Sequence, residues 1–178
     1  AVRGKLVPQD PSDEPASVLL ERIAKEKAQL IKDKKIKKQK SLLIISDEEK
    51  LFELPSAWEW CRIGNFTEVK GGKRLPKGHS LTTVNTGLAY IRVTDMKKGS
   101  VELHGIQYLM PETQKLISQY TISADDLYIT IAGTIGAAGG IPASLDGMNL
   151  TENAAKLIFS RVNKSWLKLK LSSNHVQS

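Results

Sequence analysis

The sequence has a single cysteine and only three histidines, and this scarcity excludes several kinds of site. Because Cys61 stands alone, no intrachain disulfide can form, and a cysteine-rich metal site is excluded. The histidines, His79, His104 and His175, show no H-E-x-x-H or H-x-H spacing, which argues against a zinc site. Cys61 follows Trp60 in an apolar setting and is interpreted as an ordinary, partly buried thiol.

Long hydrophobic runs are absent as well. No stretch approaches the ~18 apolar residues that a membrane-spanning helix needs, and no signal peptide is visible. We therefore expect a cytoplasmic protein in a reducing compartment. The chain begins Ala1-Val2-Arg3 without a methionine, which indicates a fragment or a processed chain.

The motifs of common enzyme classes are missing. There is no G-x-S-x-G elbow, and glycines 133, 136 and 139 recur every third residue instead of forming G-x-G-x-x-G. The loop at residues 70–78 is not a nucleotide P-loop, because no glycine stands at Thr67 and Ser/Thr is missing after Lys73. No Asn-Pro-Pro-Tyr-like tetrapeptide occurs, and the E-x-K at residues 48–50 lies in an acidic linker. We therefore expect no catalytic residue and no metal site in this chain.

The positive charge is concentrated in two segments. The net charge is +7 and the isoelectric point is near 9.4. Residues 21–40 hold nine Lys/Arg against three Asp/Glu, and residues 61–100 hold eight against two. Each segment therefore carries an excess of +6, while the rest of the chain sums to −5. Charge in patches favours a polyanionic partner over general solubility.

The pattern along the chain predicts an appendage followed by one α+β domain. Residues 1–14 are interpreted as an extended arm, and a helix with a narrow apolar stripe is expected from Pro15 to about Lys38. Its lysine-rich end is either a solvated, fraying helix end or a contact to phosphate or to a subunit. An acidic linker follows at residues 41–57. We divide the chain into residues 1–50 and a main domain at 51–178.

The stretch from residue 120 to 157 organises the main domain. Residues 127–131 alternate as in a half-buried strand, and glycines then let the backbone turn sharply or approach a neighbour closely. Further strands are expected at 88–94, 107–109 and 154–159, and a short helix from Pro111. Residues 163–175 fit either a helix capped near Asn163 or a strand. The fold class is α+β, with a twisted, mostly antiparallel sheet and short helices.

Several segments, in order, resemble the specificity subunits of type I restriction–modification systems. They are the arm at residues 4–17, the helix end at 30–38 running into 52–60, and the domain segments at 72–78, 90–96, 126–136 and 145–157. The resemblance covers nearly the whole chain. It implies a non-catalytic subunit whose target recognition domain reads one half of a bipartite site in double-stranded DNA. It also favours a helix at 163–175.

The same resemblance implies the partners. Methyltransferase subunits would use S-adenosylmethionine, and restriction subunits would use ATP and Mg, so this chain itself would hold no cofactor. A complete specificity subunit has two recognition domains and two long helical spacers, whereas this chain has one domain. It is therefore expected to be a fragment, a truncated gene product, or a half-subunit that forms a homodimer. Whether its domain is the first or the second stays open.

We assign candidate DNA-binding residues on this basis. The phosphate contacts are Lys70, Lys73, Arg74, Lys77 and Lys97, and the base or loop contacts are Arg92, Thr94, Thr134, Asn149, Thr151 and Asn153. Arg92 and Asn149 are the strongest candidates for bases. Two alternatives stay open: Arg92 pairs with Asp95, or Asn149 and Asn153 brace their own loop. The rival function is a protein-interaction module that docks on a methyltransferase subunit without binding DNA.

Overall fold

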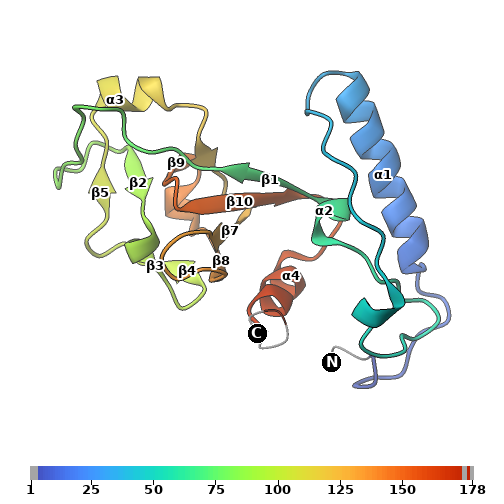
Figure 1. Cartoon of the computed structure of the whole chain (residues 1–178). Coiled ribbons are helices and arrows are strands. Elements are labelled where there is room, and N and C mark those ends of the chain that lie inside the picture. The colour runs from blue at the N-terminus through green and yellow to red at the C-terminus, as the bar shows by residue number, and fades with distance from the viewer. Residues whose placement is uncertain (1–3, 174–175, 177–178) are drawn as a thin grey trace. The chain divides into compact units, whose positions relative to one another are not determined.

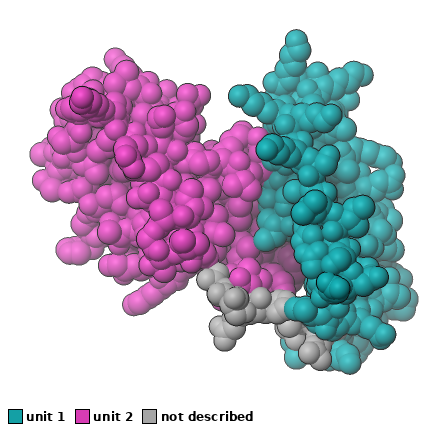
Figure 2. Space-filling model, in the orientation of Figure 1, with its two compact units in different colours: residues 1–67 teal, residues 68–178 magenta. Residues whose placement is uncertain are grey.

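Two units divide the chain, residues 1–67 and residues 68–178 (Figure 2). The structure is a computed structural model and describes residues 4–173 and 176. Residues 51–67 belong to the first unit, whereas the sequence analysis grouped them with the main domain. Where a functional recognition domain begins stays a prediction.

The first unit is built around helix α1 (Ala16–Lys32), whose one buried residue is Ile23. Lys27 Nζ donates hydrogen bonds to the carbonyl oxygens of Gly64 and Thr67, at 2.7 and 3.0 Å, and so fastens α2 (Ile63–Phe66) to α1. The helix is shorter than the expected 15–38. Lys34 takes a positive φ of 57°, and Lys35 N–H turns back to Leu30 O, which ends the helix.

The linker has little regular structure apart from one 3₁₀ turn, η1 (Asp47–Glu49). Arg62 donates to both carboxylate oxygens of Glu49, and these hydrogen bonds hold the pKa of Glu49 at about 2. Trp60 packs against Phe52 with ring centroids 4.9 Å apart, and Trp58 Nε1–H donates to Gln9. Both tryptophans are thus engaged in packing or hydrogen bonding within this unit.

The second unit contains two four-stranded sheets and a hairpin (Figure 1). The first sheet has the order β1 (Thr67–Gly71), β10 (Ala154–Phe159), β7 (Leu127–Thr130), β8 (Ala138–Gly140). The second has the order β5 (Gln107–Tyr108), β2 (Ala89–Ile91), β9 (Met148–Leu150), β6 (Thr121–Ile122). The hairpin pairs β3 (Met96–Lys97) with β4 (Ser100–Val101).

Antiparallel pairing dominates these sheets, which confirms the expected α+β class. The pairs β10–β7, β7–β8, β2–β5 and β6–β9 are antiparallel, and β2–β9 is parallel. The expectation of one sheet was too simple. Strand β2 is also shorter than the predicted 88–94, because Arg92 N–H bonds the Asp95 carboxylate at 2.9 Å and the chain turns into η2 (Val93–Asp95).

Short helices complete the second unit. Pro111 occupies the first turn of α3 (Pro111–Leu116), as its fixed φ favours. α4 (Lys164–Leu171) starts after Asn163, whose side-chain oxygen accepts Trp166 N–H at 2.9 Å. The helix alternative for the C-terminal segment is therefore confirmed, and residues 174–175 of that prediction lie outside the described residues. A further 3₁₀ turn, η3 (Ala143–Leu145), precedes β9.

Tyr128 lies in the main core of this unit, with Ile91, Ile122 and Leu150. Its hydroxyl donates to Ser100 O at 2.9 Å, which ties β7 to β4. Gly139 must be glycine, because a Cβ there would lie 2.4 Å from the Tyr128 hydroxyl oxygen. Burial raises the pKa of Tyr128 to about 12.

We expect Tyr128 to make stability fall in alkaline solution. The unfolded phenol has a pKa of 10.0 and the folded one about 12, so the stabilisation is complete below pH 10 and is lost as the pH rises towards 12. Tyr128→Phe should flatten this fall in the free energy of unfolding, measured by urea titration at about pH 9 and about pH 11. An equally steep fall in the variant would show that other groups cause it.

Candidate nucleic-acid interface

The turn at residues 151–153, which joins β9 to β10, holds three other segments of the second unit. Thr151 N–H donates to Ile91 O at the end of β2, at 3.0 Å. The carbonyl oxygen of Asn153 accepts from Ile131 N–H at 2.9 Å and from Ala132 N–H at 3.2 Å. The third segment is the basic loop, residues 70–78. We call residues 151–153 the hub turn.

The basic loop is joined through its backbone to Leu150 and Ala154, the strand residues that flank the hub turn. Gly72 N–H donates to Ala154 O at 3.1 Å, and Lys73 N–H donates to Leu150 O at 2.9 Å. A Cβ at Gly72 would lie 2.1 Å from Thr151 O, so only glycine permits this approach. The basic loop and the hub turn therefore form one connected group, although Arg74 and Glu152 are 78 residues apart in the sequence.

Side chains reinforce the junction. Tyr90, which is 4% exposed, donates its hydroxyl hydrogen to Lys73 O at 2.8 Å, and its hydroxyl oxygen lies 3.3 Å from Glu152 Oε2. Thr151 Oγ1 lies 3.0 Å from the same carboxylate oxygen. Arg74 Nε–H donates to Glu152 Oε1 at 2.8 Å. Lys73 Nζ sits 5.5 Å from the centroid of the Tyr120 ring, a cation–π distance.

These contacts keep the side-chain carboxyl of Glu152 in its ionised form. Burial alone would raise the pKa of its carboxyl, but hydrogen bonds from Arg74, from its own backbone N–H and from Thr151 lower that pKa below its ordinary value. Glu152 is therefore ionised at neutral pH. It places one negative charge next to the cations of the basic loop.

The glycine-rich loop between β7 and β8 is closed by Thr130. The Thr130 hydroxyl donates to Thr134 O and accepts Ala137 N–H at 3.0 Å, while Gly136 N–H donates to Thr130 O at 2.8 Å. Thr130 is buried, whereas Thr134 and Ile135 are exposed. A buried threonine thus fixes the base of a loop whose tip faces solvent.

The predicted phosphate contacts fall into two places. Lys70, Lys73, Arg74 and Lys77 are exposed on the basic loop, where Lys70 also pairs with Glu68 at 3.2 Å. Lys97 belongs to the β3–β4 hairpin instead, and pairs with Glu102 at 2.9 Å. Figure 1 shows that hairpin at the lower side of the second unit, with the chain after β1 along the upper side. The structure does not bring Lys97 to the basic loop.

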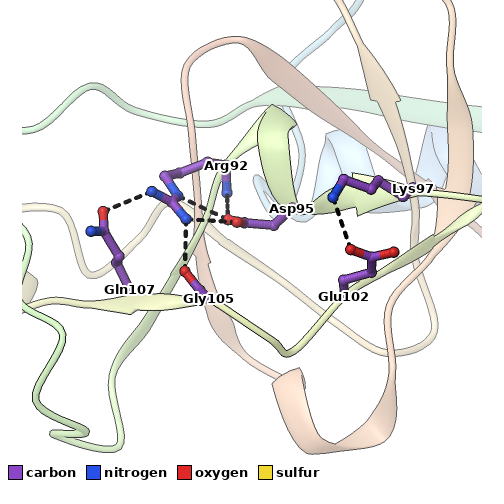
Figure 3. A network of polar contacts seen from close by, with 6 residues as sticks. All are labelled: Arg92, Asp95, Lys97, Glu102, Gly105 and Gln107. Atoms are coloured by element: carbon purple, nitrogen blue, oxygen red, sulfur yellow. Dashed lines mark hydrogen bonds and ion pairs between the residues drawn. The ribbon is translucent and has the colours of Figure 1, made fainter.

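Arg92 is occupied by neighbours within the protein (Figure 3). Its guanidinium makes two hydrogen bonds to Asp95, at 3.0 and 2.7 Å, and others to Gln107 at 2.7 Å and Gly105 O at 2.9 Å. Asp95 is 5% exposed. This geometry is the ion-pair alternative of the sequence analysis, and it makes Arg92 a poor base reader because four existing hydrogen bonds would have to be replaced.

Asn149 is also a brace. It is 2% exposed, and its Nδ2 donates to Ile117 O at 2.7 Å and Tyr120 O at 3.3 Å. Thr151 is buried as well, in the hub turn. In the free protein both residues are therefore buried supports of the exposed loops of the candidate interface. Thr94, Thr134 and Asn153 are exposed, and their contact with bases stays a prediction.

Sequence reasoning missed the residues that connect the loops. Glu152 stood inside the amide-rich run and Tyr90 on an expected strand face, but nothing local linked either to Arg74.

Among the described residues, no group of three or more His, Cys, Asp or Glu side chains is placed to hold a metal ion. None of the described helices is both long and apolar enough to cross a membrane.

Two solved structures share the fold of this chain. A chain from a solved type I restriction–modification system matches 90% of this chain and 38% of its own length, with a TM-score of 0.55 and 20% identity. The HsdS subunit from Thermoanaerobacter tengcongensis matches 90% of this chain and 42% of its own length, with a TM-score of 0.50 and 16% identity. These matches show that both of those solved chains share the fold of this chain.

Two curated proteins are similar to this chain in sequence. The EcoAI specificity subunit of Escherichia coli is 47% identical over 131 residues, which is 74% of this chain and 22% of that protein. The EcoEI specificity subunit of Escherichia coli is 40% identical over 139 residues, 78% of this chain and 23% of that protein. No family model matches the chain.

The chain is therefore a homologue of one segment of the type I restriction enzyme specificity subunits, and it spans about a fifth of the curated relatives' length. This finding confirms the resemblance on which the sequence analysis relied. It also agrees with the expectation that the chain is a non-catalytic component, since the relatives are specificity subunits.

Because Asn149 is a buried brace, Asn149→Ala should destabilise the second unit. The carbonyl oxygens of Ile117 and Tyr120 would each lose one of two donors and keep a backbone N–H, so the loss of two hydrogen bonds should cost about 1–3 kcal/mol in the free energy of unfolding. Urea titration measures this cost. Asn153→Ala, which changes an exposed amide four residues further along the chain, is the matched control and should stay within about 0.5 kcal/mol of the unaltered protein. Equal stability of both variants would refute the bracing role.

Proposed function

We propose that this chain reads one half of a bipartite site in double-stranded DNA. The observation that carries the proposal is the hub turn, which holds the basic loop and the glycine-rich loop in one preorganised group. Homology to type I specificity subunits supports sequence-specific DNA recognition as the general task. Reading a half-site is the finer step that this geometry favours, because a single group of loops covers only a few base pairs.

Within this proposal, the exposed cations set the register on the duplex. Lys70, Lys73 and Lys77 contact phosphates, as flexible point charges on a glycine-containing loop do well. Base edges meet the exposed side chains of Thr94, Thr134 and Asn153. Asn149 and Thr151 act indirectly by supporting the loops.

The proposed partners follow from the family. The DNA-reading chain directs methyltransferase and restriction subunits to their site, and the S-adenosylmethionine, ATP and Mg of those reactions belong to the partner subunits. A second copy of the half-subunit is a further proposed partner. This chain contributes recognition, and the chemistry stays with the others.

One observation favours the second candidate, a module that docks on a methyltransferase subunit. The first unit has a groove of about 1100 Å³ whose walls include Phe52, Trp58, Trp60 and Cys61. Leu43 and Ile44 also line this groove and are 83% and 93% exposed. Exposed apolar surface of this kind is typical of a protein contact. Docking by the first unit and reading by the second are compatible.

The deciding experiment is selection from a randomised duplex library at near-physiological salt, with and without a methyltransferase subunit. Enrichment of a short half-site supports the proposed function, whether it occurs with the chain alone or only in the assembly. No enrichment in either condition overturns it and leaves the docking module. The length of an enriched site tests the half-site step separately.

We expect Lys77→Ala to weaken binding to every duplex to a similar extent. Removing one phosphate contact should also reduce the slope of log K against log salt by about 0.9. The measurement is a salt titration of binding to an enriched and to an unrelated duplex. Lys25→Ala, which removes an exposed lysine of α1, is the control and should leave the slope as it was. A loss confined to one sequence would assign Lys77 to base reading instead.

A further inference from the structure

Arg74 differs from the other cations of the basic loop in how it is held. Its Nε–H is hydrogen-bonded to Glu152 Oε1 at 2.8 Å, while its side chain is 79% exposed. A guanidinium has five N–H donors, and the four on Nη1 and Nη2 lie at the end remote from Nε. The contact with Glu152 therefore fixes one edge of the guanidinium, and the opposite end extends into solvent.

Glu152 is itself positioned by residues of the core. Its second oxygen, Oε2, lies within hydrogen-bond distance of the hydroxyls of Thr151 and Tyr90, at 3.0 and 3.3 Å, and both of those residues are 4% exposed. Tyr90 also bonds Lys73 O, the carbonyl next to Arg74. An exposed ion pair contributes little to stability, so stability alone does not account for such support.

The carboxylate makes the position unfavourable for phosphate. A phosphate that approached the guanidinium would also approach the negative charge of Glu152, and the one positive charge cannot neutralise both. A base edge carries only partial charges, so the repulsion that it meets from Glu152 is much weaker. Guanine O6 and N7 are two acceptors spaced for a bidentate guanidinium, which is the most common specific contact of arginine with DNA.

We infer that Arg74 is a base-reading residue, specific for a guanine, and that Glu152 is its positioning residue. This inference rests on the proposed function and replaces the phosphate contact that the sequence analysis assigned to Arg74. Lys70, Lys73 and Lys77 keep that role. The step from Arg74 to guanine requires no rearrangement of the loop, since the guanidinium is already oriented in the free protein.

The test starts from the half-site enriched with the full chain and its methyltransferase partner. We expect that half-site to contain a guanine whose replacement by 7-deazaguanine, which lacks the N7 acceptor, weakens binding roughly tenfold. Arg74→Ala should lose this sensitivity and bind both duplexes alike. Arg74→Lys should lose most of it, because an ammonium group cannot form the planar pair of hydrogen bonds.

The Glu152→Ala variant distinguishes the two possible roles of Arg74, because each role predicts a change in DNA binding in the opposite direction. If Arg74 contacts phosphate, Glu152→Ala removes a repulsive charge and strengthens binding to every duplex. If Glu152 positions a base reader, the same variant loses roughly tenfold preference at the guanine alone. Glu152→Gln has nearly the same shape and guards against a folding defect, and it should lose part of the preference. Glu14→Gln, in another Arg–Glu pair that joins Glu14 to Arg22, is the matched control and should keep it.

The possible failures are distinguishable. Uniform weakening by Arg74→Ala, with a salt slope smaller by about 0.9, makes Arg74 a phosphate contact and overturns the inference while DNA reading stands. A half-site without an Arg74-dependent guanine also overturns the inference alone. If the unaltered protein enriches no half-site in either condition, the inference falls together with the proposed function.

Discussion

The close approach of Gly72 to the hub turn is the contact on which the candidate interface depends. Two backbone hydrogen bonds, from Gly72 to Ala154 O and from Lys73 to Leu150 O, join segments that are distant in the sequence. A larger residue at position 72 would collide with Thr151 O. Since the same turn holds residues 131–132 and the end of β2, one sterically restricted junction organises the basic loop and the glycine-rich loop.

The charge of the interface is less positive than the lysine and arginine count indicates. Lys70 pairs with Glu68, Arg74 with Glu152 and Lys97 with Glu102. Each pair reduces the long-range field and leaves shorter-range, directional interactions. Binding to such a surface depends less on simple electrostatic attraction and more on the geometry of the contacts. This suits a protein that must distinguish one sequence from many.

The regular elements were largely predictable from local patterns. Alternation located β7, Pro111 marked the start of α3, and Asn163 acted as the expected cap of α4. The partner of each strand and the residues at which two elements end were not predictable. The ends of β2 and α1 depend on a hydrogen bond from Arg92 to Asp95 and on the positive φ of Lys34. Composition does not specify either.

Burial explains why the candidate site was only partly foreseen. The sequence singled out the basic residues around position 73 and the loop at 134 separately, and the structure joins both segments to the hub turn or to the residues that flank it. Asn149 was selected for its amide, which is chemically suited to a base, but the fold uses that amide to satisfy Ile117 O and Tyr120 O. Glu152 was overlooked because an acid in an amide-rich run has no local signature of a positioning role.

The hub turn holds its neighbours mainly through peptide groups, and this has an evolutionary consequence. Hydrogen bonds from Ile131, Ala132 and Lys73 to carbonyl oxygens do not depend on which side chains those residues carry. Exposed positions such as Thr134 and Lys77 can therefore be exchanged by mutation without disturbing the scaffold. The architecture thus permits new sequence preferences to arise by single surface replacements on an unchanged fold.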